Sequence, residues 1–156
     1  MLQPSEKIWM DGAFVNWGDA SVHVLTHSLH YGLAAFEGIR CYKGREGSAI
    51  FRLPEHVDRL FESAHIAMME LPYDKKQITD AIVETVRINK LEACYIRPLV
   101  YVGYGAMGLY PGENPIKVAM VDRGTTCLKV KIGMKALRMA PKIGRMRTSR
   151  RCTINR

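Results

Sequence analysis

The stretch Cys94-Tyr95-Ile96-Arg97-Pro98-Leu99-Val100-Tyr101-Val102 decides the fold class, because its side chains alternate in character with a period of two. One set is apolar throughout and is expected to face a core: Cys94, Ile96, Pro98, Val100 and Val102. The opposite set is Tyr95, Arg97, Leu99 and Tyr101. A strand of this kind predicts an antiparallel sheet covered on one side. A phenol and a guanidinium on one face suit the capture of a carboxylate or phosphate, and they equally suit a sheet face that is simply wet.

A second two-faced strand is expected over Ala34–Tyr42. One of its faces holds Ala34, Phe36, Gly38, Arg40 and Tyr42. Glycine inside a strand weakens it, and it marks either the close approach of a ligand or backbone, or a bulge or packing position. Phe36 and Arg40 on either side of Gly38 would make an apolar slot with a charged neighbour.

The other expected strands are short and flank this pair. Asp11-Gly12 between two apolar runs predicts a hairpin over Ile8–Trp17, because the turn needs the positive φ that these residues tolerate. The segment Ala34–Tyr42 is expected to pair with Ser48–Arg52. A further short strand is expected over Ile116–Val121.

Two consecutive helices are inserted between the strands. The first begins near Pro54 and carries an apolar stripe at helical spacing: Val57, Leu60, Phe61, Ala64 and Met68. Arg59 lies beside this stripe, where it is either a solvated flank or a group that reaches across the sheet edge to an anion. The second helix covers about Lys75–Lys90, with Asp74 and Gln77 resembling a capping box. Hairpins with two inserted helices predict an α+β domain.

Composition excludes several classes of protein. The 156 residues, 47% of them hydrophobic, suit one soluble domain, and no run approaches the roughly 18 apolar residues of a membrane span. The four cysteines form no C-x-x-C pair, and neither a signal peptide nor a metal site is expected, even though His23, His27 and His30 are closely spaced. A cytoplasmic location is expected.

The net charge of +8 is confined to the end of the chain. Residues 1–121 hold 12 Lys/Arg and 14 Asp/Glu, whereas residues 122–156 hold 11 Lys/Arg and one Asp. We therefore expect a domain over 1–121 and a basic tail over 122–156. One hypothesis is that the tail binds nucleic acid, although it lacks the aromatic residues that stack on bases.

Three glycines after the long strand, Gly103, Gly105 and Gly108, spell a G-x-G-x-x-G. A dinucleotide loop would need a helix next, but Pro111 and Pro115 follow, so a glycine loop overhanging a pocket is the better interpretation.

Several of these motifs together resemble the branched-chain amino-acid aminotransferases. The resemblance rests on residues 27–32, on Phe36-Glu37-Gly38-Ile39-Arg40-Cys41-Tyr42, on Glu55–Leu60, on Tyr95–Leu99 and on the loop 103–108. Relatives such as D-amino-acid aminotransferases share the fold, but the Phe-Glu-Gly-Ile-Arg stretch is not expected in them. The resemblance implies the N-terminal domain of a fold-type IV pyridoxal-phosphate enzyme that works as a homodimer or higher assembly on an amino acid and a 2-oxo acid.

The resemblance also implies roles for single residues. Arg59 would hold the cofactor phosphate. Phe36, Gly38 and Tyr31 would line the pocket for the branched side chain, with Tyr31 a candidate for donation by the partner subunit. Tyr95 would seat the substrate carboxylate, and Arg97 and Arg40 would shape the polar end. Met107 would belong to the loop that covers the neighbouring subunit's pocket.

The chain departs from the family after Val121. The lysine that forms the Schiff base, expected in a Lys-x-x-Gly-Asn-Tyr-like segment, does not occur, and the tail lysines stand in a different context. A reading-frame shift near codon 121 is our hypothesis for both the lost match and the change of charge, with in-frame divergence and truncation as the alternative. The chain alone is expected to bind cofactor weakly and to be inactive.

Overall fold

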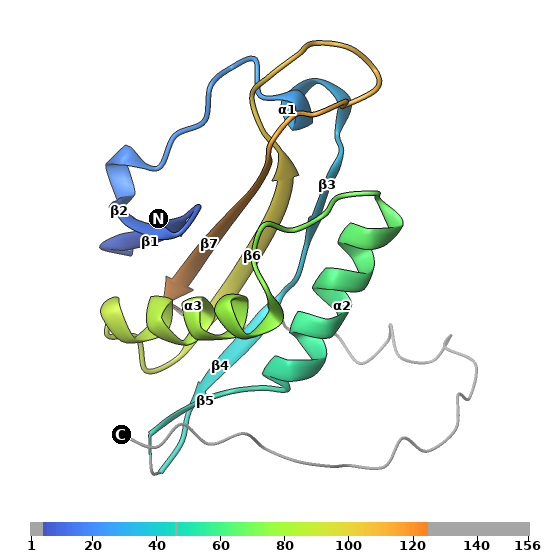
Figure 1. Cartoon of the computed structure of the whole chain (residues 1–156). Coiled ribbons are helices and arrows are strands. Elements are labelled where there is room, and N and C mark those ends of the chain that lie inside the picture. Colours follow the sequence, from blue (N-terminus) through green and yellow to red (C-terminus); the bar gives the residue numbers. More distant parts are fainter. Residues whose placement is uncertain (1–4, 46, 125–156) are drawn as a thin grey trace, which may run out of the picture.

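The computed structural model describes residues 5–45 and 47–124, and in this part of the chain the strands form one antiparallel sheet (Figure 1). The strand order is β2-β1-β7-β6-β4-β5, and β3 also pairs with β6. The strands are β1 (Lys7–Met10), β2 (Ala13–Asn16), β3 (Ala34–Phe36), β4 (Ile39–Lys43), β5 (Ser48–Ile50), β6 (Cys94–Val102) and β7 (Ile116–Gly124). The helices are the 3-10 turn η1 (Trp17–Asp19), α1 (His27–Tyr31), α2 (Leu53–Ile66) and α3 (Lys75–Ile88).

β6 is the central strand, and its predicted apolar face is confirmed. It pairs with β7 over all nine of its residues. Cys94, Ile96, Val100 and Val102 are each 0% exposed, and Pro98 is buried too. The expected α+β domain, an antiparallel sheet with two long helices, is therefore the fold of the described chain.

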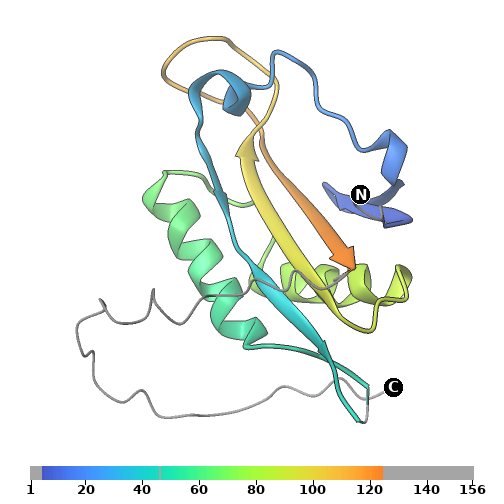
Figure 2. The same cartoon turned by 180° about the vertical axis from the view of Figure 1, so that it is seen from behind.

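Helices α2 and α3 cover this apolar face, and the opposite face of the sheet is free of both (Figures 1 and 2). Asp74 precedes α3 and caps it, and the predicted capping box forms between Asp74 and Gln77. The stripe of α2 is buried at Val57, Leu60 and Ala64, but Met68 is 89% exposed, so its assignment to the stripe is wrong. The helix ends at Ile66, and Met68 turns the chain with a φ of 54°, which brings Met69 into the core instead.

The strand expected over Ala34–Tyr42 is two strands, β3 and β4, interrupted at Glu37 and Gly38. The pairing register with β6 is unchanged across the gap, since Phe36 lies opposite Leu99 and Ile39 opposite Ile96. Pro98 explains the interruption. It accepts a hydrogen bond from the Glu37 amide at 3.1 Å, but it has no N–H to return one.

The strand expected to end at Val121 continues to Gly124 as β7. Its Asp122 is 0% exposed and accepts hydrogen bonds from the Ser5 hydroxyl and the Asn89 side-chain amide, so it belongs to the folded sheet. The rest of the basic tail, residues 125–156, lies outside the described part of the chain, together with the predictions that rest on it.

A short helix, α1, forms where none was expected. Gly32 ends it with a φ of 73°, in the left-handed region that glycine favours. The Ser28 hydroxyl accepts a hydrogen bond from the Val102 amide and so fixes the helix to the end of β6. None of the described helices is long and apolar enough to cross a membrane.

Candidate functional site

The helix-free face of the sheet gathers most of the side chains singled out from the sequence. The register places Arg40 opposite Tyr95 and Phe36 opposite Leu99, so their side chains share this face. Arg97 lies between them. Its Nη2 donates to the Tyr95 hydroxyl at 2.8 Å, and its guanidinium carbon lies 4.4 Å from the centre of the Phe36 ring. The predicted alternation thus brings four side chains together on this face. We call Phe36, Arg40, Tyr95 and Arg97 the Phe36–Arg97 cluster.

Gly38 is part of the same cluster because it leaves room for Tyr95. A methyl group built at Gly38 would lie 2.2 Å from the Tyr95 hydroxyl oxygen, which is closer than real contacts allow. Its backbone φ is not in the left-handed region. Of the interpretations left open by the sequence, the structure supports a packing position, because the side chain of Tyr95 on the neighbouring strand fills the space beside Gly38.

An apolar hollow of about 320 Å³ adjoins the cluster on this face. Leu99, which lies opposite Phe36 in the sheet, lines this hollow, and so does Leu29 of α1. Its full lining is Ile8, Met10, Ala20, Val22, Thr26, Ser28, Leu29, Ala34, Leu99, Tyr101, Ala119 and Val121. An apolar hollow beside a guanidinium and a phenol suits a ligand with an apolar body and an anionic end.

Arg59 lies at the edge of the sheet, on α2, where it forms a two-point ion pair with Glu37. Nε and Nη2 of Arg59 each donate to one carboxylate oxygen of Glu37 at 2.6 Å, and Nδ1 of His56 lies 2.8 Å from Glu37 Oε2. The hydrogen bond from Arg59, joined by His56, lowers the pKa of Glu37 from 4.5 to about 2, although burial opposes the shift. Glu37 points to the opposite side from Phe36 and Gly38, so its role was not visible from the sequence pattern.

Tyr31 and Met107 form a separate group at the end of β6. The Tyr31 ring lies 4.5 Å from the ring of His27, whose Nε2 lies 2.8 Å from the carbonyl oxygen of Gly108 in the glycine loop. Both side chains are exposed, at 39% for Tyr31 and 47% for Met107. Within the described residues, no hydrogen bond or ring contact joins this group to the Phe36–Arg97 cluster.

The glycine loop is held by an asparagine that the sequence analysis missed. The Ala106 amide donates a hydrogen bond to Oδ1 of Asn114 at 2.6 Å, and Nδ2 of Asn114 donates one to the Ala106 carbonyl at 2.9 Å. The only sequence signal was its place before Pro115 at the end of the loop. This pair of bonds gives the loop around Met107 a defined shape.

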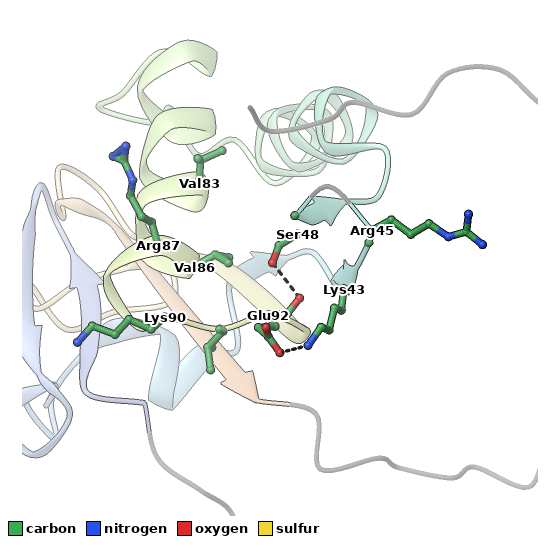
Figure 3. A pocket seen from close by; sticks show the side chains of 11 residues that line it. Lys43, Arg45, Ser48, Val83, Val86, Arg87, Lys90 and Glu92 are labelled. Carbon is green, nitrogen blue, oxygen red and sulfur yellow. Dashed lines mark hydrogen bonds and ion pairs between the residues drawn. The ribbon is translucent and has the colours of Figure 1, made fainter. Parts of the chain in front are cut away.

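A second hollow, of about 860 Å³, lies between the β4–β5 hairpin and the end of α3 (Figure 3). Several cations line it, but Lys43 is paired with Glu92 at 2.7 Å and Arg45 extends away from that pair. Arg87 bonds Glu84 on its own helix. The cations therefore do not converge on a common point, and we do not regard this hollow as an anion site.

Potential metal ligands do not cluster in the described part of the chain. No three His, Cys, Asp or Glu side chains gather there to hold a metal ion. Lys43, Lys75 and Lys117 pair with Glu92, Asp58 and Asp11, away from the Phe36–Arg97 cluster.

The chain matches a known protein family over more than half of its length. Residues 34–129 match the family Amino-transferase class IV, and the chain belongs to this family. A branched-chain-amino-acid aminotransferase of Pseudomonas aeruginosa is 55% identical over 102 residues, which cover 65% of this chain and 33% of that protein. The protein of the same name from Escherichia coli K12 is 43% identical over 107 residues, covering 69% of this chain and 35% of its own.

Solved structures show the same partial correspondence. The branched-chain aminotransferase of the archaeon Thermoproteus uzoniensis with norvaline superposes with a TM-score of 0.72 and 39% identity, covering 76% of this chain and 40% of that one. The Escherichia coli enzyme superposes with a TM-score of 0.73 and 39% identity, covering 76% and 40%. The chain thus spans about one third to two fifths of its relatives, and its fold is that of the fold-type IV branched-chain aminotransferases.

Proposed function

We propose that this chain is the substrate-binding, N-terminal part of a pyridoxal-phosphate-dependent branched-chain amino-acid aminotransferase. The observation that carries the proposal is the cluster of Phe36, Gly38, Tyr95 and Arg97 beside an apolar hollow. Such a site fits an aliphatic amino acid or 2-oxo acid, whose two ends differ in polarity.

The polar end of the site is set by Arg97. Its Nη2 is oriented by the Tyr95 hydroxyl, and the Phe36 ring supports the face of the guanidinium. A guanidinium held in this way presents its remaining N–H groups to a carboxylate in a fixed direction. Arg40, exposed and opposite Tyr95, adds a second positive charge at this end.

The cofactor would be held in part by Arg59. Its side chain is 61% exposed, and Nη1 has no bonding partner among the described residues, so the group can donate hydrogen bonds to a phosphate. A related branched-chain aminotransferase has been solved with pyridoxamine 5'-phosphate, which is consistent with this role. When bound, pyridoxal phosphate supplies the electron sink that amino-group transfer requires. The sequence holds no Lys-x-x-Gly-Asn-Tyr-like segment, so we expect the isolated chain to show no transamination of leucine with 2-oxoglutarate.

Tyr31 and Met107 are proposed to act on a neighbouring subunit's pocket. They lie apart from the Phe36–Arg97 cluster and are exposed, as such a role requires. Size-exclusion chromatography with light scattering tests the assembly on which this role depends.

Binding of a substrate-like acid tests the proposal directly. 4-Methylvaleric acid, the ligand of one solved branched-chain aminotransferase, is titrated into the chain and followed by NMR, with 4-methylpentan-1-ol as a probe that lacks the carboxylate. We expect the acid to bind more tightly than the alcohol, and the difference to disappear in Arg97→Gln. Arg52→Gln, an exposed arginine outside the cluster, is the matched control. Equal binding of acid and alcohol to the unmodified chain would contradict the proposed site.

A rival function for the basic tail 122–156, nucleic-acid binding, stays a prediction because its residues 125–156 lie outside the described part of the chain. A filter-binding assay on the full chain and on a chain lacking residues 125–156 checks it. If the deletion changes nothing, the hypothesis fails.

A further inference from the structure

The buried carboxylate between Phe36 and Gly38 has no role in the function proposed so far. We propose that Glu37 is a positioning residue that holds the Arg59 guanidinium in the orientation that receives the cofactor's phosphate. The inference rests on the proposed function, because it needs Arg59 to bind a phosphate.

The first support is the difference in exposure across the ion pair. The Glu37 side chain is 6% exposed, whereas the Arg59 side chain is 61% exposed. The carboxylate is therefore the fixed, inner partner. The arginine is attached to it by one edge and presents the rest of its guanidinium outward.

The second support is that Glu37 uses only two of the N–H donors of Arg59. Arginine has five N–H groups in a rigid fork. Glu37 takes one from Nε and one from Nη2, both at 2.6 Å, and Nη2 also lies 3.2 Å from Nδ1 of His56. Both hydrogens of Nη1 are without a partner in the described chain. This outward edge is the geometry in which arginine binds a phosphate.

The third support is the rigidity of Glu37 itself. Its amide donates to the carbonyl of Pro98 on β6, and His56 lies 2.8 Å from its Oε2, so backbone and side chain are both held. Phe36 and Gly38 on either side face the substrate cluster. One short segment therefore connects the arginine proposed for the phosphate with the wall of the proposed substrate pocket.

Two opposing effects decide how much Glu37 strengthens the binding of a phosphate by Arg59. Its negative charge repels a phosphate, but the two would lie on opposite edges of the guanidinium, with water screening the exposed side. Without Glu37, the arginine would have to lose its rotamer freedom on binding, which weakens affinity about fivefold or more. We therefore expect the positioning effect to exceed the repulsion.

The test compares a phosphate-bearing probe with its dephosphorylated form on the full 156-residue chain. Pyridoxamine 5'-phosphate and pyridoxamine are titrated separately, and binding is followed by NMR, including the Nε–H signal of Arg59. Neither probe carries an aldehyde, so neither reacts with lysines. The unmodified chain should prefer the phosphorylated probe.

Two variants separate positioning from charge. Glu37→Gln removes the charge, and Glu37→Asp keeps the charge but is one methylene too short to hold both nitrogens. We expect both to bind pyridoxamine 5'-phosphate about threefold or more weakly, with pyridoxamine unchanged. Glu55→Gln is the matched control, since Glu55 forms an exposed ion pair with Arg52 on the same helix. If Glu37 only stabilised the fold, the variants would bind pyridoxamine 5'-phosphate and pyridoxamine more weakly to the same extent.

The outcomes distinguish this inference from the proposed function. If the unmodified chain binds the two probes equally, the role of Arg59 and this inference both fail. If the phosphate preference exists and Arg59→Gln abolishes it, but both Glu37 variants keep or strengthen it, only the inference fails. Circular dichroism confirms that each variant is folded; should Glu37→Gln unfold, Glu37→Asp decides alone.

Discussion

Replacing Gly38 with alanine tests whether the arrangement of the Phe36–Arg97 cluster depends on the absence of a side chain at position 38. The new Cβ would lie 2.2 Å from the Tyr95 hydroxyl oxygen and 3.0 Å from its Cζ. The hydroxyl must therefore move away by about 1 Å to restore ordinary contact. Because Gly38 does not have a positive φ, alanine adds no backbone strain, and the effect isolates this contact.

The expected cost follows from what the displaced ring loses. Overpacking in a core costs about 1–3 kcal/mol, and we expect the lower end of this range here because the Tyr95 ring is only half-buried; its hydrogen bond from Arg97 is worth about 1 kcal/mol at most. Replacing glycine with alanine also stabilises the folded protein by about 0.4–1 kcal/mol, because alanine lowers the conformational entropy of the unfolded chain. A net destabilisation of about 1–2 kcal/mol corresponds to a fall in Tm of about 3–8 °C for a domain of this size.

Thermal unfolding followed by circular dichroism measures this fall. Gly18→Ala is the matched control, because nothing lies within 4 Å of a Cβ at that position. The double variant Gly38→Ala, Tyr95→Phe removes the hydroxyl that the Cβ meets, so it should recover part of the loss. A Gly38→Ala chain as stable as Gly18→Ala would refute the reasoning.

Three further predictions concern stability. Glu37 has a pKa of about 2 in the folded chain, below its ordinary 4.5, so its ion pair stabilises the fold above pH 4.5 and this stability is lost as the pH falls toward 2. Urea unfolding across this range should show a contribution of about 2 kcal/mol that Glu37→Gln lacks. Asn89→Ala removes donors to the buried carboxylate of Asp122 and should cost about 2–4 kcal/mol in urea unfolding, and a loss below about 1 kcal/mol would contradict this. Asp74→Ala removes the cap of α3 and should cost about 1 kcal/mol, with the exposed Asp80→Ala as its control.

The sequence by itself determined the features that follow from local periodicity. The alternation in β6 predicted the side chains that face the core, and the spacing in α2 and α3 predicted the helices that cover them, because side-chain direction repeats regularly along each element. It did not predict that Tyr101, on the opposite face, is buried as well. The α+β class and the grouping of Phe36, Gly38 and Arg40 on one face came from the same rule. The resemblance to a family added an expected role for each.

The tertiary structure decided the features that depend on residues far apart in the chain. Pro98 interrupts the strand at Glu37 because the register brings the two together. That register also sets the Tyr95 hydroxyl against Gly38, and packing of α2 at the sheet edge brings Arg59 to Glu37. Periodicity tells which way a side chain points, but only the pairing of strands and the packing of helices determines what it meets there.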